Sequence, residues 1–348
     1  MQNSRARKAY SVLLFMSVLL LGAMIFSISW GQVTVPWRDT LIIIGQHIPI
    51  WKDSLPLVNP EYQAVIWHIR LPRVLVGVLV GAALGVSGAV MQGVFSNPLA
   101  DPGIIGVSSG AAFGAVVAIA LGLTTISMYV MPLFALLGAI MAVMLTVCLA
   151  TRHGKTPVMT LLLAGVTVSM LMGAFTSAFL TFMNEYRVRE FLFWSVGGLD
   201  YRRWEHVYLA IGPVIVGITL LCLLARHLNV LVLGEQEARS VGVPVVALRL
   251  LLLFVSTVTT SVAVCVSGAI GFVGLIVPHI MRLMIGPEHR WLLPGSALAG
   301  ALFLVFCDTL GRMILPPNEI RVGIMTALVG APYFLYLLRK AQKAGGAL

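Results

Sequence analysis

Long apolar runs separated by short polar stretches dominate the pattern along this chain. Most of them have the roughly 20 residues that a helix needs to cross the hydrocarbon core of a bilayer. Backbone groups cannot be hydrated there, so runs of this length predict helices. Ten runs can be distinguished, at about residues 11–30, 73–95, 104–123, 128–150, 157–183, 206–225, 246–268, 270–286, 291–311 and 322–339. Gly268, Gly271 and Gly274 leave the break between the seventh and eighth runs ambiguous.

The first run follows a basic N-terminus and is longer than the apolar core of a signal peptide. No small-residue cleavage site follows it, so we expect it to stay as the first span. Residues 31–69 form a long connection that contains Trp37, Trp51 and Trp67, and tryptophan favours the membrane interface. Ten spans would place both termini on one side. With that side in the cytoplasm, the lysines and arginines show a small bias of the expected sign.

Composition agrees with a membrane protein. Of the 348 residues, 59% are hydrophobic and 10% are charged, and the mean hydropathy is +0.97. A soluble domain is about 45–50% apolar and about 25% charged, so a soluble enzyme, a disordered chain and a disulfide-rich module are all excluded. The net charge of +10 is expected at membrane boundaries and not on nucleic acid. We therefore predict a single all-α transmembrane domain over residues 1–348.

Small residues recur at four-residue spacing in two of the runs. This spacing forms a smooth stripe along one helix face and allows two backbones to approach closely. We expect these positions to serve helix packing and not chemistry. They are Gly77, Gly81 and Gly85 in one run, and Gly106, Gly110 and Gly114 in the next.

The chain lacks the patterns of a catalytic, phosphate or metal site. Gly154-Lys155-Thr156 resembles the end of a P-loop, but position 149 is leucine where that motif needs glycine. Residues 106–110 fit G-x-S-x-G but open an apolar helix, whereas a nucleophile elbow needs a strand before it. The histidines and cysteines have no metal-ligand spacing. An ion-coupled secondary transporter would need acids at mid-depth in the spans, and we find no such set.

Three polar segments stand out from this apolar background. Arg70-Leu71-Pro72-Arg73 lies at the outer entrance of the second run. Residues 97–103 contain two prolines and a glycine, which force a break between helices. Residues 233–244, inside a cytoplasmic connection of about 226–245, read as a short polar helix that Gly242 and Pro244 end. Such an element suits docking to a partner, although a plain solvated loop has a similar composition.

These segments and the glycine-rich blocks around them resemble the FecCD family. That family comprises the membrane subunits of ABC importers for ferric siderophores, haem and cobalamin. The resemblance covers about residues 60–340. Besides Arg70-Leu71-Pro72-Arg73, the matching blocks are residues 81–85, 88–92, 97–103, 106–107, 161–165, 234–242, 268–275, 278–279 and 330–332.

The resemblance implies a type II ABC importer permease bundle of ten transmembrane helices with both termini in the cytoplasm. It implies a second permease copy, which we expect to be identical, two cytoplasmic ATPase subunits and a periplasmic or lipid-anchored binding protein. The partner ATPases would use ATP and magnesium, and this chain would bind no cofactor or metal. The expected location is the bacterial cytoplasmic (inner) membrane, in contact with lipid. An iron chelate, either ferric siderophore or haem, is the first expectation for the cargo, and cobalamin is the alternative.

The resemblance also assigns roles to residues of this chain. Arg70, Arg73 and Arg312 would meet acidic groups of the binding protein, with Arg321 a weaker candidate and lipid headgroup anchoring the alternative. Asp308 and Arg312, four residues apart, are also expected to form an ion pair near the outer end. Contact with the ATPase falls on Gly234, Glu235, Ala238, Arg239 and Gly242. From the break at residues 97–103 and the start of the fifth run, we hypothesise that the translocation path or its inner gate falls on Met91, Gln92, Asn97, Pro98, Leu99, Met159 and Thr160.

Overall fold

Every element in the computed structural model is helical. The structure describes residues 2–31, 33–51, 54–151 and 156–343, and these residues contain no strand. The expected all-α fold is therefore present. Gly154 and Lys155 of the P-loop-like segment lie outside the described residues. The α-helices are α1 (Gln2–Ser29), α2 (Trp37–Gln46), α3 (Pro60–Ala64), α4 (Leu71–Val94), α5 (Val107–Ala120), α6 (Val130–Ala150), α7 (Val158–Phe182), α8 (Glu185–Ser195), α9 (Trp204–Leu223), α10 (Ala225–Leu233), α11 (Glu235–Ser240), α12 (Val245–Ser267), α13 (Val273–Ile285), α14 (His289–Met313) and α15 (Val322–Lys343).

Each of the ten apolar runs contains one of these helices. Among the described residues, seven helices are long and apolar enough to cross a membrane, namely α1, α4 with the turns before it, α6, α7, α9, α12 and α14. The apolar parts of α5, α13 and α15 are shorter, at 10–17 residues. The crossing of the membrane by these three therefore stays a prediction. The ambiguous break is resolved, because α12 ends at Ser267 and Gly268 leaves the helix with φ +73°.

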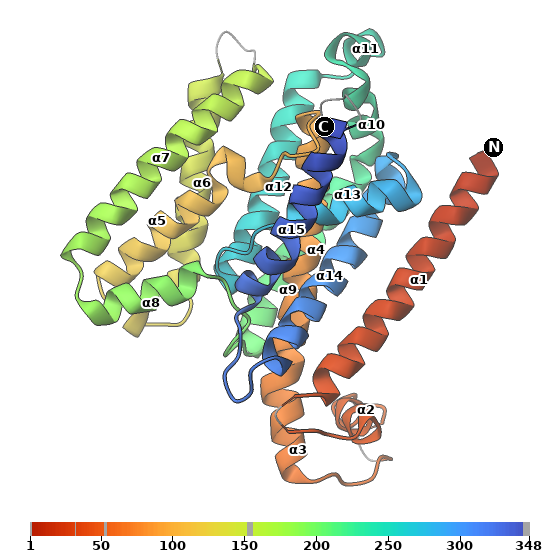
Figure 1. Cartoon of the computed structure of the whole chain (residues 1–348), viewed down its shortest axis with the longest axis vertical. Helices are drawn as coiled ribbons and strands as arrows, with labels where there is room; N and C mark the ends of the chain where they lie inside the picture. The colour runs from red at the N-terminus through yellow and green to blue at the C-terminus, as the bar shows by residue number, and fades with distance from the viewer. Residues whose placement is uncertain (1, 32, 52–53, 152–155, 344–348) are drawn as a thin grey trace.

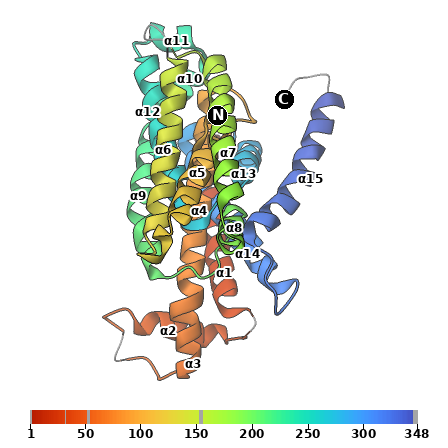
Figure 2. The same ribbon diagram turned by 90° about the vertical axis from the view of Figure 1, so that its left-hand side faces the viewer.

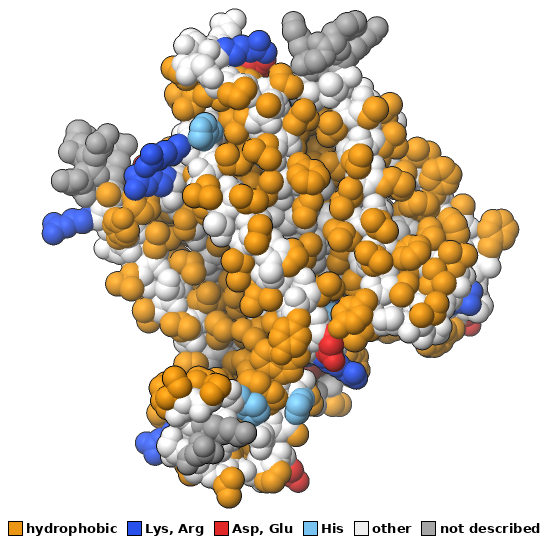
Figure 3. Space-filling model, turned by 180° about the vertical axis from the view of Figure 1, so that it is seen from behind, with side chains coloured by type: hydrophobic (Ala, Val, Ile, Leu, Met, Phe, Trp, Pro, Cys, Tyr) orange, Lys and Arg blue, Asp and Glu red, His pale blue; other side chains and the backbone are white. Residues whose placement is uncertain are grey.

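The bundle has two ends of different character (Figure 1). One end carries α10, α11 and the start of α7, and is called the α11 end. The opposite end carries α2, α3 and the connection between α14 and α15, and is called the α2–α3 end. Helix α1 begins, and α15 ends, toward the α11 end, in agreement with an even number of crossings (Figures 1 and 2). Between the two ends, the face in Figure 3 is mostly hydrophobic, as a lipid-facing surface would be.

Helix α4 lies at the centre of the bundle and packs against α12, α13 and α14. A Cβ atom on Gly81 would overlap the carbonyl group of Gly300, and one on Gly85 would overlap the carbonyl of Ser296, both in α14. These two glycines therefore let the α4 and α14 backbones touch, as their spacing predicts. Gly77 differs, because its nearest neighbours are the side chains of Leu199 and Val305 and not a backbone.

The second glycine stripe holds α5 against α6. Gly110 faces the carbonyl of Gly138, and Gly114 faces that of Phe134. Gly106 has a different role from the one its spacing suggests. It is the residue before α5 and has φ +96°, a conformation that favours glycine, while the nearest atom to an added Cβ is 3.5 Å away. Gly106 therefore serves a turn and not a close helix contact.

Candidate functional site at the two ends of the bundle

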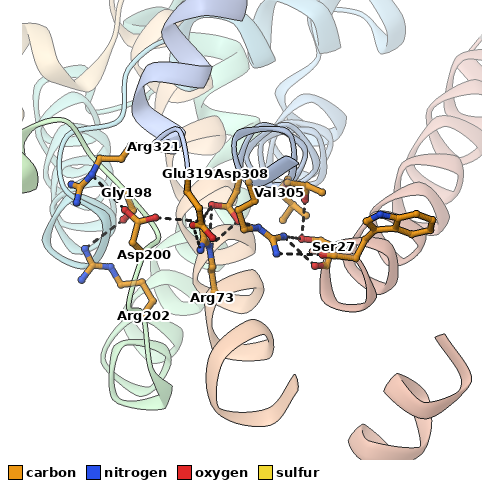
Figure 4. A network of polar contacts seen from close by, with 12 residues as sticks. Ser27, Arg73, Gly198, Asp200, Arg202, Val305, Asp308, Glu319 and Arg321 are labelled. Atoms are coloured by element: carbon orange, nitrogen blue, oxygen red, sulfur yellow. Dashed lines mark hydrogen bonds and ion pairs between the residues drawn. The ribbon is translucent and has the colours of Figure 1, made fainter. Parts of the chain in front are cut away.

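Arg73, in the first turn of α4, is the centre of a buried ion cluster at the α2–α3 end (Figure 4). Its Nη2 lies 2.8 Å from Oδ1 of Asp308 in α14, and its Nε donates to both oxygens of that carboxylate. Its Nη1 lies 2.7 Å from Glu319, in the α14–α15 connection, and Nη2 lies 3.3 Å from Asp200, in the α8–α9 connection. Because Arg73 is only 8% exposed, these acids are needed to offset the burial of its charge.

Arg70 and Arg312 converge on the last turn of α1. Arg70 is the last residue of a π-helical turn, Val65–Arg70, and its Nη1 donates to the carbonyls of Ile28 and Ser29, each at 2.9 Å. Arg312 donates to the carbonyl of Ser27 at 3.0 Å, and its Nε lies 3.3 Å from Asp308. The last carbonyls of a helix have no partner within it and carry a partial negative charge. The two arginines therefore cap α1, and the expected Asp308–Arg312 pair is present.

These contacts change the interpretation of the three arginines that sequence assigned to the binding protein. Arg70, Arg73 and Arg312 are each less than 9% exposed, and their donors are directed to groups of this chain. In this conformation they hold helices and connections of the α2–α3 end together, and their side chains do not project from its surface. Sequence reasoning missed Asp200 and Glu319. The signal was available, because a buried arginine near a membrane boundary requires an acid close by.

A cavity of about 910 Å³ opens beside this ion cluster. Arg73, Arg202, Arg203 and Arg321 contribute positive charge to its wall, against Asp200 and Glu319. The residues that line it are His68, Ile69, Arg73, Phe193, Asp200, Tyr201, Arg202, Arg203, Pro317, Asn318, Glu319 and Arg321. The excess of arginine suits an anionic partner.

The arginines of the cavity wall differ in how firmly they are held. Arg321 lies 4.5 Å from the ring centroid of Phe193 and pairs with Asp200 at 3.5 Å. Burial lowers the pKa of Arg202 to about 10, so this side chain is still a cation at neutral pH. The side chain of Arg203 is exposed and has no ion pair within the described residues. Arg203 is therefore the most accessible of the four arginines in the cavity wall.

At the α11 end, the polar segment folds as the short helix that the sequence predicts. Gly234 and Gly242 bound α11 with φ values of +140° and +82°, and Ala238 is fully buried against the bundle. Arg239 pairs with Glu235 at 2.7 Å, one turn apart. The hydrogen bond from Arg239, with the nearby charge of Arg249, lowers the pKa of Glu235. The pair holds an exposed carboxylate and an exposed guanidinium on the outer side of α11.

Arg249 is a further residue of this end that sequence reasoning missed. It lies in α12 and is 5% exposed. Its Nη1 donates to the carbonyl of Thr156 at 2.9 Å, and its Nη2 lies 3.4 Å from Glu235. An arginine in the first turns of an apolar helix was the only signal in the sequence.

The residues assigned to a path or gate are not all in one environment. Side-chain caps organise the break between α4 and α5, since Asn97 accepts from the backbone N–H of Leu99 at 2.9 Å and Pro98 is half-buried beside it. Met159 and Thr160 are exposed in the first turn of α7, also at the α11 end. Met91 and Gln92 are buried inside the bundle, so in this conformation neither side chain lies on the surface of the subunit, and their assignment to the path stays a prediction.

Gln92 instead supplies a hydrogen bond that is missing from the backbone of α13. Pro278 has no N–H, so the carbonyl of Gly274, four residues earlier, receives no helical hydrogen bond. The Nε2 group of Gln92 donates to Gly274 at 3.2 Å and to Leu275 at 3.1 Å. Its Oε1 accepts from Arg282 at 3.0 Å. Gln92 thus ties α4 to α13 and gives a donor to the one carbonyl that Pro278 leaves without its helical partner.

Comparison with known proteins gives a consistent picture. The profile of the FecCD transport family matches residues 19–340. The cobalamin import permease BtuC of Halobacterium salinarum is 50% identical over 325 residues, which cover 89% of this chain and 87% of the relative. The hemin transport permease HmuU of Yersinia pestis is 42% identical and covers 83% of this chain and 89% of its own. The vitamin B12 import permease BtuC of Salmonella paratyphi A is 38% identical over 98% of both chains.

Among solved structures, one described as an inward-facing ABC transporter of the metal-chelate type has a TM-score of 0.83 and 33% identity. It covers 95% of this chain and 99% of its own length. A chain of PsaBC from Streptococcus pneumoniae, solved in complex with Fab, has a TM-score of 0.55 at 18% identity, and is similar in fold alone.

Proposed function

This chain belongs to the FecCD transport family of ABC permease subunits, and on that premise we propose that its cargo is a metal tetrapyrrole, with cobalamin first. The observation that carries this choice is the 50% identity with a cobalamin import permease over 89% of the chain. Haem is the second candidate, because a hemin permease is 42% identical. From the sequence we expected an iron chelate, either ferric siderophore or haem, with cobalamin as the alternative, and the identity with the cobalamin permease supports the opposite order that we propose here.

We propose that the α11 end faces the cytoplasm and that α11 contacts an ATPase subunit. The support is a short helix with exposed polar residues, bounded by two glycines and anchored by the buried Ala238. Two such ATPases would bind two copies of this chain, and those partners would hold the ATP and magnesium. Both termini would then lie in the cytoplasm, and the chain would be a multi-pass protein of the cytoplasmic membrane.

The binding protein would dock on the opposite, α2–α3 end. The support is the arginine-rich cavity there, where Arg203 is exposed. Arg70, Arg73 and Arg312 would contribute by holding α1, α4 and the α14–α15 connection in place, and by adding to the positive potential of this face. Charged groups of this kind raise the rate of encounter and orient the partner.

The experiment is uptake by proteoliposomes that contain this chain, its cognate ATPase and its binding protein, with ATP enclosed. Labelled cobalamin, haem and a ferric siderophore are offered in turn. We expect cobalamin to accumulate and the siderophore not to. Accumulation of haem alone would reassign the cargo within the tetrapyrroles, and accumulation of the siderophore alone would contradict the tetrapyrrole proposal.

A further inference from the structure

We propose that Arg249 links the ATPase-facing helix α11 to the entry of α7, so that a movement of α11 repositions the start of α7. The inference rests on the proposed function of α11, and it assigns a positioning role to a residue far from any cargo. One guanidinium group joins three elements that are separate along the chain. These are the carboxylate of Glu235 in α11, the helix α12 that carries Arg249, and the main chain of Thr156 just before α7.

The contact with Thr156 fixes the point where α7 begins. Thr156 is 2% exposed and precedes Pro157, the residue that opens α7. Its carbonyl accepts from Arg249, while its hydroxyl group lies 3.1 Å from that of Thr151, the C-cap residue directly after α6. A shift of the Arg249 side chain would therefore change the position of the first turn of α7, where Met159 and Thr160 are exposed.

The contact with Glu235 makes Arg249 sensitive to the position of α11. The two oxygens of Glu235 are divided between two arginines, Oε1 with Arg239 at 2.7 Å and Oε2 with Arg249 at 3.4 Å. Arg239 belongs to α11 and moves with it, but Arg249 belongs to α12 and is buried. If α11 moved away, Arg249 would lose this counter-charge, and a buried unpaired charge is strongly unfavourable. The side chain would have to follow the carboxylate and loosen its bond to Thr156.

The two bonds of Arg249 thus depend on each other, which is the physical requirement for coupling between two sites. The planar guanidinium group suits this role because it presents several donors in fixed directions. A lysine at this position has one charged nitrogen at the end of a flexible chain. It could keep a charge near Glu235 without holding Thr156 in the same geometry.

The functional test compares ATP hydrolysed per labelled cobalamin transported in proteoliposomes of the complete complex. For Arg249→Gln we expect this ratio to rise about tenfold, within the range typical of coupling between two sites, while binding-protein affinity is unchanged. Arg249→Lys should also raise the ratio, by less. Leu248→Ala is the matched control, because it removes a buried apolar side chain from the adjacent position of α12 and leaves the groups that bond Glu235 and Thr156 in place. It should keep the wild-type ratio.

A distance measurement separates transmission from simple damage. Spin labels at Gln236 in α11 and at Met159 in α7 are each paired with one at Phe306 in α14, and all three positions are exposed. In the wild type, ATP should change both distances. In Arg249→Gln the α11 distance should still change, but the α7 distance should not.

A wild-type ATP ratio in Arg249→Gln, together with a normal response of the α7 label, would overturn the link while leaving the transport function intact. If Arg249→Gln does not assemble, Arg249→Lys decides, and a wild-type ratio there would overturn the link equally. ATP-independent uptake by the wild-type complex would instead contradict the proposed function, and the link would fall with it.

Discussion

Single arginines make most of the buried ion pairs of this permease, and Arg73 gives the sharpest prediction. Its substitution by glutamine would leave Asp308, Glu319 and Asp200 without their shared cation. Removing one partner of a buried ion pair costs about 3–5 kcal/mol, so Arg73→Gln should lower the thermal unfolding temperature in detergent clearly. The control is Arg189→Gln, since Arg189 pairs with Glu185 while 68% exposed. It should cost no more than about 1 kcal/mol. Equal unfolding temperatures for the two variants would refute the cluster's structural role.

Arg203 tests the docking surface at the same scale. Reversal of this exposed charge should weaken binding-protein affinity by up to about fivefold, because each rim ion pair contributes about 0.2–1 kcal/mol. The loss should shrink at high salt, where exposed charges are screened. The measurement is the Kd of the binding protein for Arg203→Glu at two salt concentrations. Arg290→Glu, at the opposite end of the bundle, is the control. If the Kd of the binding protein depended on salt identically in both variants, the cavity would not be part of the docking surface.

At this scale the sequence predicted which arginines matter more reliably than what they contact. Arg70-Leu71-Pro72-Arg73 stood out because arginine is unusual on the outer side of a membrane protein. The sequence could not indicate that Arg70 would cap α1, because that contact joins residues 42 positions apart through a π-helical turn. Asp200 and Glu319 lie in connections that carry no periodic pattern, so their approach to Arg73 depends on the tertiary fold.

Helix α4 is the element on which most of the packing depends, and its glycines make a direct prediction. A methyl group on Gly81 would overlap the backbone of α14, where there is little freedom to move. Overpacking of this kind costs about 1–3 kcal/mol, so Gly81→Ala should lower the unfolding temperature. Gly212→Ala in α9 is the matched control, because the space around Gly212 is open. Because alanine favours a helix over glycine, Gly212→Ala should leave the free energy of unfolding unchanged or raise it by about 0.5–1 kcal/mol. A stable Gly81→Ala variant would refute the backbone contact.

The bridge from Gln92 to α13 predicts a specific coupling. Gln92→Met leaves the carbonyl of Gly274 unbonded and should cost about 1–3 kcal/mol. Pro278→Ala would return an N–H to that carbonyl, so the double variant should be more stable than the sum of the two single effects implies. Thermal unfolding of the four proteins of this cycle measures the coupling. The same cycle with Pro294→Ala, in α14, should be additive. If the effects of Gln92→Met and Pro278→Ala were also additive, Gln92 would not be bonding the carbonyl that Pro278 leaves free.

At the element scale, the ten apolar runs each contained a helix, because hydrophobic length is a strong signal in a membrane chain. The four-residue glycine spacing correctly indicated close packing at Gly81, Gly85, Gly110 and Gly114. It misassigned Gly106, whose positive φ is set by the turn before α5 and not by a neighbouring helix. Spacing alone cannot distinguish a glycine needed for its conformation from one needed for its small size.

The whole molecule combines two charged ends with an apolar middle. One end has an arginine-rich cavity held together by ion pairs, and the other has α11 and the Arg249 contacts at the start of α7. Between them, the candidate spans among the described residues contain no set of acids that would suggest ion coupling. This arrangement suits a subunit that receives cargo at one end and is driven by a partner at the other.

The energy source is therefore the most direct test of the account. Proteoliposomes with this chain, its ATPase and its binding protein would be loaded with ATP, or would be given a proton or sodium gradient without ATP. Uptake of labelled cobalamin is measured in each. We predict accumulation with enclosed ATP alone and none with either gradient alone. Accumulation that follows an ion gradient and ignores ATP would contradict an ATP-driven permease.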